Sequence, residues 1–284
     1  KPNHETTIEI EKIKNKINIL ILNNFKNLFK TIFFLIRGNY SLVHIHYLGW
    51  HSLLSLFINP NSKLVVTPWG SDILQKRNFI KNIWLGILFK KSNFMICDSE
   101  RLVNESIKLG IKRNKTMITM FGVDTNLYKK TRDVFANKKY YSVGSNRKLE
   151  DIYDVQTFIK AAQRICKIRN DIVFYIAGNG SLEGKLKKEI EETNMKDNIK
   201  FLGLLNKNQM IDFYNKIDIY VSTSLSDGGL AASIAEAMSF ERIIIVSNNS
   251  DNKIWIRNKQ NGYLFESKDY KNLSNLIIYA IENK

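Results

Sequence analysis

The sequence predicts an α/β protein built on parallel sheets. Short, continuously apolar runs rich in β-branched residues alternate with segments of helical periodicity along the 284 residues. Strands that are apolar on both faces are typical of parallel sheets with helices on both sides. About ten such runs exceed the number of strands that one doubly wound sheet usually needs, and 44% hydrophobic residues provide enough apolar side chains for two cores.

The expected elements follow one another in the order strand, helix, strand, which favours parallel pairing. In the first half the expected strands are Leu42–Tyr47, Lys63–Thr67, Phe94–Asp98 and Thr116–Met120. In the second half they are Tyr140–Gly144, Ile172–Ala177, Ile199–Leu202, Ile217–Val221, Ile243–Ser247 and Gly262–Phe265. Helical spacing is found at Val155–Cys166, Leu182–Glu192, Gln209–Lys216, Ala231–Phe240 and Tyr270–Ile281.

A charged segment without sustained periodicity, GVDTNLYKKTRDVF at residues 122–135, separates the two halves and predicts a linker. We therefore expect two Rossmann-like domains, residues 1–134 and 135–284. Ligands of such sheets bind at the carboxyl ends of the strands, so two facing domains would form a central cleft.

The formal net charge of +16 is unevenly distributed. The first 134 residues contain 21 Lys and Arg against 9 Asp and Glu, whereas the remainder contains 22 against 18. This asymmetry indicates a polyanionic partner near the first half or a compositional bias. The two cysteines, Cys97 and Cys166, lie far apart without a CxxC motif, which argues against a disulfide scaffold and a zinc module.

Two further patterns bear on location in the cell. The first ten residues, KPNHETTIEI, lack the apolar core of a secretory signal, so we expect a cytoplasmic protein. Residues 17–36 are apolar at helical spacing but contain Lys26 and Lys30, which disfavours a membrane span. We expect this segment to pack on a sheet, and contact with the inner face of an anionic membrane is the alternative. Such contact is also an alternative for Phe79–Lys91 (FIKNIWLGILFKK), which is the better candidate of the two.

The most informative stretch is Ser222–Ser247, STSLSDGGLAASIAEAMSFERIIIVS. An apolar strand ends in a loop containing Gly228 and Gly229, and an Ala-rich helix follows. The free amides and the dipole at such a helix start suit a diphosphate. Glu236, about one and a half turns into the helix, suits a ribose hydroxyl pair. The alternative is an ordinary Asp-Gly turn with a solvated glutamate.

This stretch resembles the nucleotide-sugar site of retaining GT-B glycosyltransferases of family 4, also called glycosyl transferases group 1. The resemblance extends over nearly the whole chain, through LVHIHY, VVTPWGSDIL, MFGVDTNLY, SVGSNRKLEDIYDV, YIAGNGSLEGKL and NGYLF, in that order. It implies the GT-B fold, with a first domain that lacks its N-terminal strand and helix. It also implies metal-independent, retaining transfer of a hexose-type sugar from a UDP-sugar, or less favourably a GDP-sugar, to a glycan or lipid-linked acceptor, with no cofactor and no nucleic acid.

The resemblance also implies roles for residues of the second half. Glu236 would bind the ribose, Arg147 the diphosphate, and Asp227 with the backbone of Gly228, Gly229 and Leu230 the donor sugar and diphosphate. Gly144, Ser145 and Gly178 would line the donor site. Eight residues separate Asp227 and Glu236, where the family commonly has seven, and no lysine clearly matches the family's phosphate-binding lysine.

Candidate acceptor-side residues gather in the first half. His44 and His46 have the i, i+2 spacing that places both on one sheet face, and His51 follows closely. We expect His46 and Asp72, together with Arg147 and Asp227 of the second half, in catalysis, and His44, His51, Trp69 and Ser71 in acceptor binding. Histidines packed at a strand end, and a Trp69 that anchors the core, remain alternatives. Other functions on this fold are a nucleotide-sugar epimerase or a sugar phosphorylase, and a different class is a basic nucleic-acid or membrane-binding module.

Overall fold

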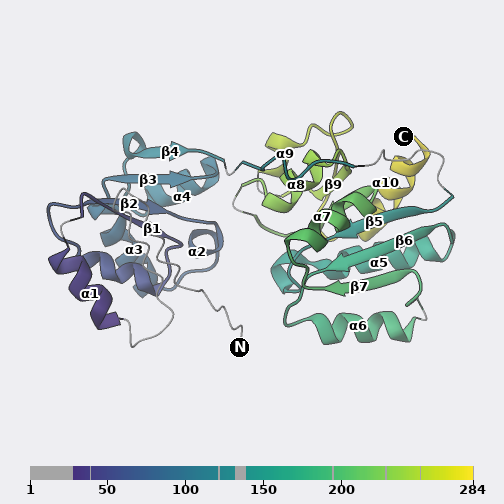
Figure 1. Ribbon diagram of the computed structural model, residues 1–284, viewed down its shortest axis with the longest axis horizontal. Helices are drawn as coiled ribbons and strands as arrows, with labels where there is room; N and C mark the ends of the chain where they lie inside the picture. Colours follow the sequence, from purple (N-terminus) through teal and green to yellow (C-terminus); the bar gives the residue numbers. More distant parts are fainter. Residues whose placement is uncertain are drawn as a thin grey trace. The chain divides into compact units, whose positions relative to one another are not determined.

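The computed structural model describes residues 28–38, 40–120, 122–131, 139–193, 195–227, 229–249 and 251–283. The chain divides into two compact units, Lys1–Thr119 (unit 1) and Met120–Lys284 (unit 2). Figure 1 shows strands and helices interleaved within each unit. Residue 134, the boundary expected from the sequence, lies outside the described residues.

Unit 1 contains a parallel sheet with the strand order β1-β2-β3-β4. Its strands are Leu42–His46 (β1), Lys63–Thr67 (β2), Phe94–Cys97 (β3) and Thr116–Ile118 (β4). Its helices are Leu28–Arg37 (α1), Trp50–Phe57 (η2, a 3₁₀ helix), Ser71–Leu74 (α2), Phe79–Lys91 (α3), Glu100–Lys108 (α4) and Arg113–Lys115 (η3).

Capping residues fix where the longer helices of unit 1 begin. The Asn78 side chain accepts a hydrogen bond from the Lys81 amide at 2.8 Å and starts α3. The Ser99 hydroxyl caps α4 in the same way through the Leu102 amide. Each cap satisfies an amide that a helix start otherwise leaves unpaired. Both helices thereby direct apolar side chains into one core with β2 and β3, which includes Leu64, Val66, Leu85, Phe89, Met95 and Leu102.

Unit 2 contains a six-stranded parallel sheet with the order β10-β9-β8-β5-β6-β7. The strands are Tyr141–Ser145 (β5), Ile172–Ala177 (β6), Ile199–Gly203 (β7), Ile219–Ser222 (β8), Ile243–Ser247 (β9) and Tyr263–Phe265 (β10). The chain proceeds from β5 towards β7 on one side and from β8 towards β10 on the other. The strand order therefore reverses between β5 and β8, the place where ligands bind in open α/β sheets.

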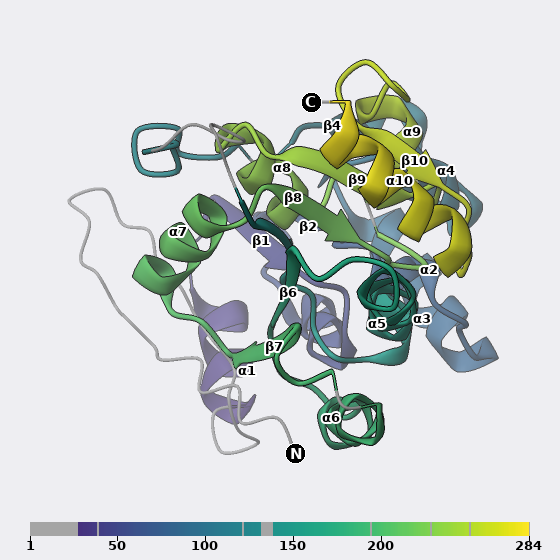
Figure 2. The same ribbon diagram turned by 90° about the vertical axis from the view of Figure 1, so that its right-hand side faces the viewer.

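Helices cover both faces of this sheet. They are Asp151–Tyr153 (η4), Val155–Cys166 (α5), Glu183–Glu192 (α6), Lys207–Lys216 (α7), Ala232–Ser239 (α8), Asn252–Trp255 (α9) and Tyr270–Glu282 (α10). One core joins α5, α6 and α10 to side chains such as Val143 and Val221, and a second joins α7 and α8 to Tyr220 and Ile244. Figure 2 shows α7 and α5 on opposite sides of the strands.

Every strand expected from the sequence is present, with ends that differ by at most two residues. The five expected helices of the second half are also confirmed. In the charged segment after residue 121, residues 125–127 form a turn, and the Asp124 carbonyl accepts a hydrogen bond from the Tyr128 amide at 2.8 Å. The helices α2, α4 and α9 are not among the expected elements.

Candidate functional site

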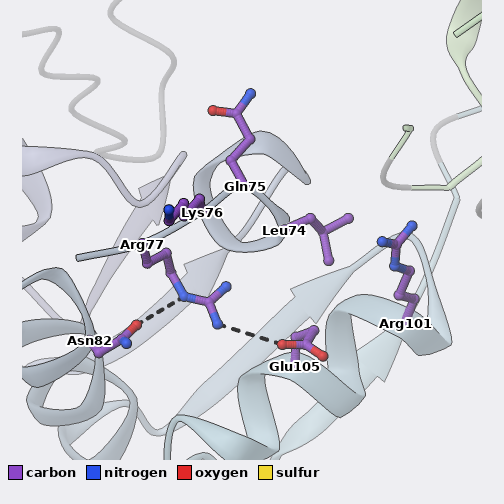
Figure 3. A pocket seen from close by; sticks show the side chains of 7 residues that line it. All are labelled: Leu74, Gln75, Lys76, Arg77, Asn82, Arg101 and Glu105. Carbon is purple, nitrogen blue, oxygen red and sulfur yellow. Dashed lines mark hydrogen bonds and ion pairs between the residues drawn. The ribbon is translucent and has the colours of Figure 1, made fainter. Parts of the chain in front are cut away.

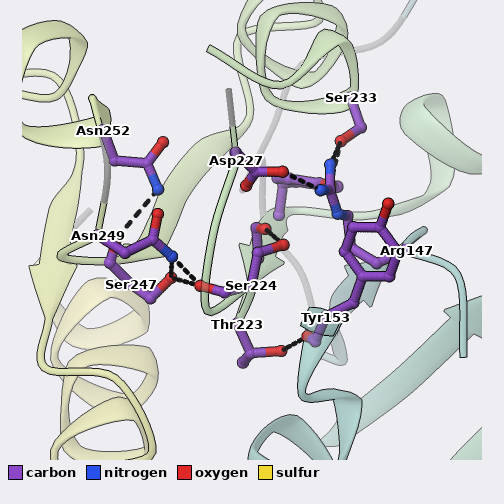
Figure 4. A network of polar contacts seen from close by, with 11 residues as sticks. Arg147, Tyr153, Thr223, Ser224, Asp227, Ser233, Ser247, Asn249 and Asn252 are labelled. Atoms are coloured by element: carbon purple, nitrogen blue, oxygen red, sulfur yellow. Dashed lines mark hydrogen bonds and ion pairs between the residues drawn. The ribbon is translucent and has the colours of Figure 1, made fainter. Parts of the chain in front are cut away.

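Arg147 lies in the loop that follows β5, at the strand-order reversal of unit 2. Its side chain is largely buried and forms an ion pair with Asp227, from the loop after β8. A second donor, Nη1, lies 3.1 Å from the Ser233 hydroxyl of α8, and the guanidinium lies 4.5 Å from the centre of the Tyr153 ring. Figure 4 shows these groups converging from three segments. Burial acts most strongly and lowers the pKa of Arg147, but Asp227, Tyr220 and Tyr153 together raise it by more, so the net direction is upward and the cation is retained.

Two glycines set the position of the Arg147 loop. A Cβ at Gly178, where φ is +124°, would lie 2.5 Å from the Arg147 carbonyl oxygen. A Cβ at Gly180 would lie 2.3 Å from the Leu149 carbonyl oxygen. Any side chain at these positions would push the loop away. Gly178, expected in donor binding, therefore has a packing role beneath Arg147.

Gly144 and Ser145 end β5 directly before this loop. A Cβ on Gly144 would lie 2.6 Å from Ile217 Cγ2 and 2.7 Å from Phe213 Cζ, so the glycine admits the end of α7. Packing against α7 accounts for a glycine at position 144 without any contact to a ligand, whereas the sequence predicts a contact of Gly144 with the donor. Ser145 is fully buried, and its hydroxyl has no hydrogen-bond partner in the described part of the chain.

The start of α8 faces the same region. Ala231 occupies its N-cap position and offers no side-chain acceptor to the first-turn amides. Leu230 is half-buried and Gly229 is buried, while Gly228 lies outside the described residues. The Ser233 hydroxyl, in the first turn of α8, also accepts a hydrogen bond from Tyr220 at 2.8 Å. The amides of α8 and the Arg147 guanidinium thus provide an electropositive region for an anion.

Glu236 lies further along α8 and is half-buried. Its Oε2 atom lies 2.7 Å from the hydroxyl of Tyr214, a buried residue of α7. That hydroxyl also lies 2.7 Å from the Asn146 amide nitrogen, next to Arg147. Burial raises the pKa of Glu236, and the Tyr214 hydrogen bond partly opposes that shift. Glu236 is predicted from the sequence as a site residue, whereas Tyr214 is not, because a tyrosine on an apolar helix face is usual in a core.

A polar cluster at the ends of β8 and β9 completes the region (Figure 4). The Ser247 hydroxyl donates to the Ser224 carbonyl at 2.6 Å, and the Asn249 side chain donates to both residues. Thr223 donates to the Tyr153 carbonyl at 2.9 Å, which joins the β8 loop to η4. This cluster is not among the residues predicted from the sequence, although the polar runs directly after two apolar strands are a signal for it.

In unit 1, the expected residues gather at the ends of β1 and β2. The His44 and His46 rings lie 4.1 Å apart, as their spacing predicts, and His44 Nε2 lies 2.8 Å from the Thr67 hydroxyl. His51 Nε2 lies 3.2 Å from the His46 carbonyl oxygen. Burial lowers the pKa of His46, and burial together with His46 lowers that of His44, which favours neutral rings at pH 7.

Trp69 and Ser71 lie next to these histidines. The Trp69 ring centre is 6.1 Å from that of His46, and Trp69 is 43% exposed, which contradicts the alternative that it anchors the core. The Ser71 hydroxyl lies 3.4 Å from the Tyr47 hydroxyl. An exposed indole beside two imidazoles is a surface on which a sugar ring can stack.

Asp72 differs from its expected role. Its carboxylate is buried, with 1% exposure, and accepts the amide hydrogen bonds of Leu48 at 2.7 Å and Trp69 at 3.0 Å. Because these bonds hold the loops after β1 and β2 together, Asp72 positions His46 and Trp69 rather than presenting oxygens to a sugar. The prediction of a catalytic Asp72 is corrected accordingly.

No group of three or more His, Cys, Asp or Glu side chains in the described ranges is arranged to hold a metal ion. Among the same residues, no helix has the length and apolar character needed to cross a bilayer.

Comparisons with known proteins identify the family. The model of the family described as glycosyl transferases group 1 matches residues 128–284. A poly(ribitol-phosphate) alpha-N-acetylglucosaminyltransferase of Staphylococcus aureus is 27% identical over 208 residues, 69% of this chain and 40% of the relative. An Escherichia coli UDP-Gal:alpha-D-GlcNAc-diphosphoundecaprenol alpha-1,3-galactosyltransferase is 27% identical over 62% of this chain and 39% of its own length. This chain thus spans about 40% of both relatives.

A solved structure gives the same result for the fold. The structure of an S. aureus TarM mutant in complex with fondaparinux, alpha-GlcNAc-glycerol and UDP matches with a TM-score of 0.76 and 18% identity, over 90% of this chain and 52% of that one. The match covers both parallel sheets, since it includes nine-tenths of the residues. The chain belongs to the glycosyl transferases group 1 family and has the GT-B fold.

Proposed function

We propose that the chain is a glycosyltransferase that moves a hexose-type sugar from a nucleotide-diphosphate sugar to a glycan or lipid-linked acceptor in surface-polysaccharide assembly. The observation that carries this proposal is the convergence of Arg147, the α8 start and Glu236 at the strand-order reversal of unit 2. UDP is the favoured nucleotide, because the similar TarM structure contains UDP and the name of the E. coli relative specifies a UDP-sugar. That name also specifies a diphosphate-lipid acceptor.

The donor fits the site by charge and shape. The diphosphate would lie against Arg147 and the first-turn amides of α8, where a planar guanidinium and free amides bind phosphate oxygens. The ribose hydroxyls would donate to Glu236, with Tyr214 holding its Oε2 atom. Asp227, paired with Arg147, keeps the guanidinium in place before the donor arrives.

The mechanism proposed is retaining and independent of a metal ion. As the bond between the anomeric carbon and the diphosphate breaks, negative charge accumulates on the departing oxygen. Arg147 and the α8 amides would stabilise that charge without reorganising. The acceptor hydroxyl would attack from the face that the diphosphate leaves and pass its proton to the departing diphosphate oxygen, so no protein nucleophile is needed. His46 and Trp69 of unit 1 are the proposed acceptor-side groups.

Nucleotide binding provides the first test. We expect UDP to raise the melting temperature of the wild-type protein, and Glu236→Gln to weaken UDP binding about tenfold or more, since a lost hydrogen bond to a charged group costs about 1.5–3 kcal/mol. Glu241→Gln is the matched control, because Glu241 is an exposed carboxylate that pairs with Lys130 near the end of the same helix. Equal UDP stabilisation in both variants would refute the ribose assignment.

Product analysis tests the reaction itself. With a UDP-sugar and a glycan acceptor, a transferase releases UDP and extends the acceptor, and the anomeric configuration of the product reports retention. An isomerised donor would identify an epimerase, and phosphate-dependent release of a sugar would identify a phosphorylase. Activity that survives a chelator would support the metal-independent mechanism.

A further inference from the structure

Two adjoining cavities in unit 1 differ sharply in character. The first has a volume of about 280 Å³, lies among α2, α3 and α4, and is lined by polar groups that include Lys76, Arg77, Arg101 and Glu105 (Figure 3). The second has a volume of about 630 Å³ and is lined largely by apolar side chains, among them Trp50, Leu53, Ile80 and Trp84. Lys76 and Arg77 line both cavities.

The first cavity has an excess of positive charge. Three cationic side chains line it against one carboxylate, Glu105. Arg77 is held in place, since its Nε donates to Asn82 Oδ1 at 3.0 Å and its Nη2 lies 3.5 Å from Glu105 Oε2. Glu105 also pairs with Lys108 at 2.6 Å, outside the cavity lining, so its charge is shared. A fixed guanidinium with two further cations suits a phosphate group.

The second cavity continues into an exposed apolar face of α3. Phe79 and Ile80 are 78% and 72% exposed, and Ile83 and Ile87 are also exposed, whereas Leu85, Leu88 and Phe89 of the same helix are buried. The helix is therefore apolar on its outer as well as its inner side. An apolar stripe on a helix is normally buried against apolar groups, so this outer stripe of α3 favours an apolar partner. Exposed apolar patches with a polar rim mark interaction sites.

We propose that this face of unit 1, formed by η2, the start of α3 and the two cavities, docks on an anionic phospholipid bilayer. Phosphate headgroups lie at Lys76, Arg77 and Arg101, and the side chains of Phe79, Ile80 and Trp50 enter the upper acyl region. A phospholipid, with a charged head and an apolar tail, suits both cavities, because Lys76 and Arg77 lie where the polar cavity adjoins the apolar one. Tryptophan and lysine at that boundary are typical of interfacial anchors. This inference does not depend on the proposed reaction.

Vesicle binding tests it directly. We expect the protein to sediment with vesicles of phosphatidylglycerol and phosphatidylcholine, and to bind pure phosphatidylcholine vesicles at least about tenfold more weakly, since each cation near an anionic surface contributes about 1 kcal/mol. The double variants Phe79→Ser/Ile80→Ser and Lys76→Glu/Lys81→Glu should each lose most of the binding.

Matched controls come from unit 2. Ile168→Ser removes another exposed apolar side chain, and Lys185→Glu/Lys188→Glu reverses two exposed lysines of α6, so both should leave vesicle binding unchanged. Circular dichroism melting checks that each variant is folded. The salt dependence of vesicle binding provides a test that needs no variant. Raising the salt concentration from about 0.1 to about 1 M shortens the Debye length from about 10 to 3 Å, so the wild-type protein should dissociate from the vesicles.

Three results of the vesicle experiments would overturn the proposal. These are equal binding to both vesicle types, control variants that lose as much binding as the test variants, and wild-type binding that salt does not weaken. Inorganic phosphate is added in a separate arm. If millimolar phosphate alone stabilises the protein and abolishes vesicle binding, the first cavity is a site for a free anion rather than for a bilayer.

Discussion

The hydroxyl of Tyr214 is the point at which three segments meet. It lies 2.7 Å from Asn146 Nδ2 of the Arg147 loop, 2.7 Å from Glu236 Oε2 and 3.2 Å from the Ser233 carbonyl of α8. Burial, Tyr220 and Glu236 all raise the pKa of Tyr214, so it is a neutral donor at physiological pH. Tyr214 therefore connects the proposed phosphate-binding loop to the proposed ribose-binding carboxylate.

Tyr214→Phe is predicted to change the pH dependence of UDP binding. If an ionised Glu236 binds the ribose, affinity is full above the pKa of Glu236 and falls as the pH drops through it. The Tyr214 hydrogen bond lowers that raised pKa, so its loss should move the midpoint to higher pH. Calorimetric titration of UDP at a series of pH values measures the midpoint.

The matched control is Tyr220→Phe. Its hydroxyl donates to Ser233 Oγ and not to Glu236, although its ring lies near Tyr214. Glu236 also contributes to raising the pKa of Tyr128 and that of Tyr220, in both cases behind burial, and both phenols stay neutral over the pH range in which Glu236 titrates. We expect the midpoint to stay in place in Tyr220→Phe. A midpoint that moves equally in both variants, or in neither, would show that Tyr214 acts only through packing.

At the scale of elements, the end of α7 packs directly against β5, next to the proposed donor loop, because Gly144 has no side chain. Gly144 of β5 leaves room for Phe213 and Ile217, and the two residues belong to the core shared by α7 and α8. Because β5 is an inner strand of its sheet, β5 and α7 can move apart only by disturbing that core.

Gly144→Ala is therefore predicted to destabilise unit 2 by about 1–3 kcal/mol, the usual cost of overpacking. Gly184→Ala is the opposite case, since Gly184 lies in α6 with nothing within 4 Å of an added Cβ. That variant should gain about 0.5–1 kcal/mol from helix propensity. Urea unfolding midpoints measure both, and a Gly144→Ala midpoint at or above that of Gly184→Ala would contradict the packing argument.

The elements that could be predicted from the sequence are those whose buried residues form an apolar run or recur at helical spacing. The strands of unit 2 are continuously apolar because helices cover both faces, and α5 and α10 show clear amphipathic spacing. The four-residue helices α2 and α9 are too short for a period to be seen. The contacts of Tyr153, Tyr214 and Ser233 with site residues depend on tertiary proximity, which spacing along the chain does not report.

At the scale of the whole molecule, each unit has its own core and its own candidate residues. Arg147, Asp227 and Glu236 all lie in unit 2, whereas the histidines, Trp69 and the two cavities lie in unit 1. The charge asymmetry that the sequence shows follows the same division, with the excess of cations in the first half. Nucleotide binding should therefore stabilise unit 2 and leave the stability of unit 1 unchanged.

Calorimetry is predicted to resolve two unfolding transitions, of which UDP raises only one. A ligand at about 100 times its dissociation constant stabilises its unit by about 2.7 kcal/mol, which corresponds to a shift of several degrees for a domain of this size. Gly144→Ala, measured without UDP, identifies the transition of unit 2 because it should lower that one alone. Glu236→Gln should reduce the UDP shift by about half or more, because a tenfold rise in Kd lowers the stabilisation from about 2.7 to about 1.4 kcal/mol at the same UDP concentration. If UDP instead raised the transition that Gly144→Ala leaves unchanged, the nucleotide would bind unit 1 and the proposed donor site would be wrong.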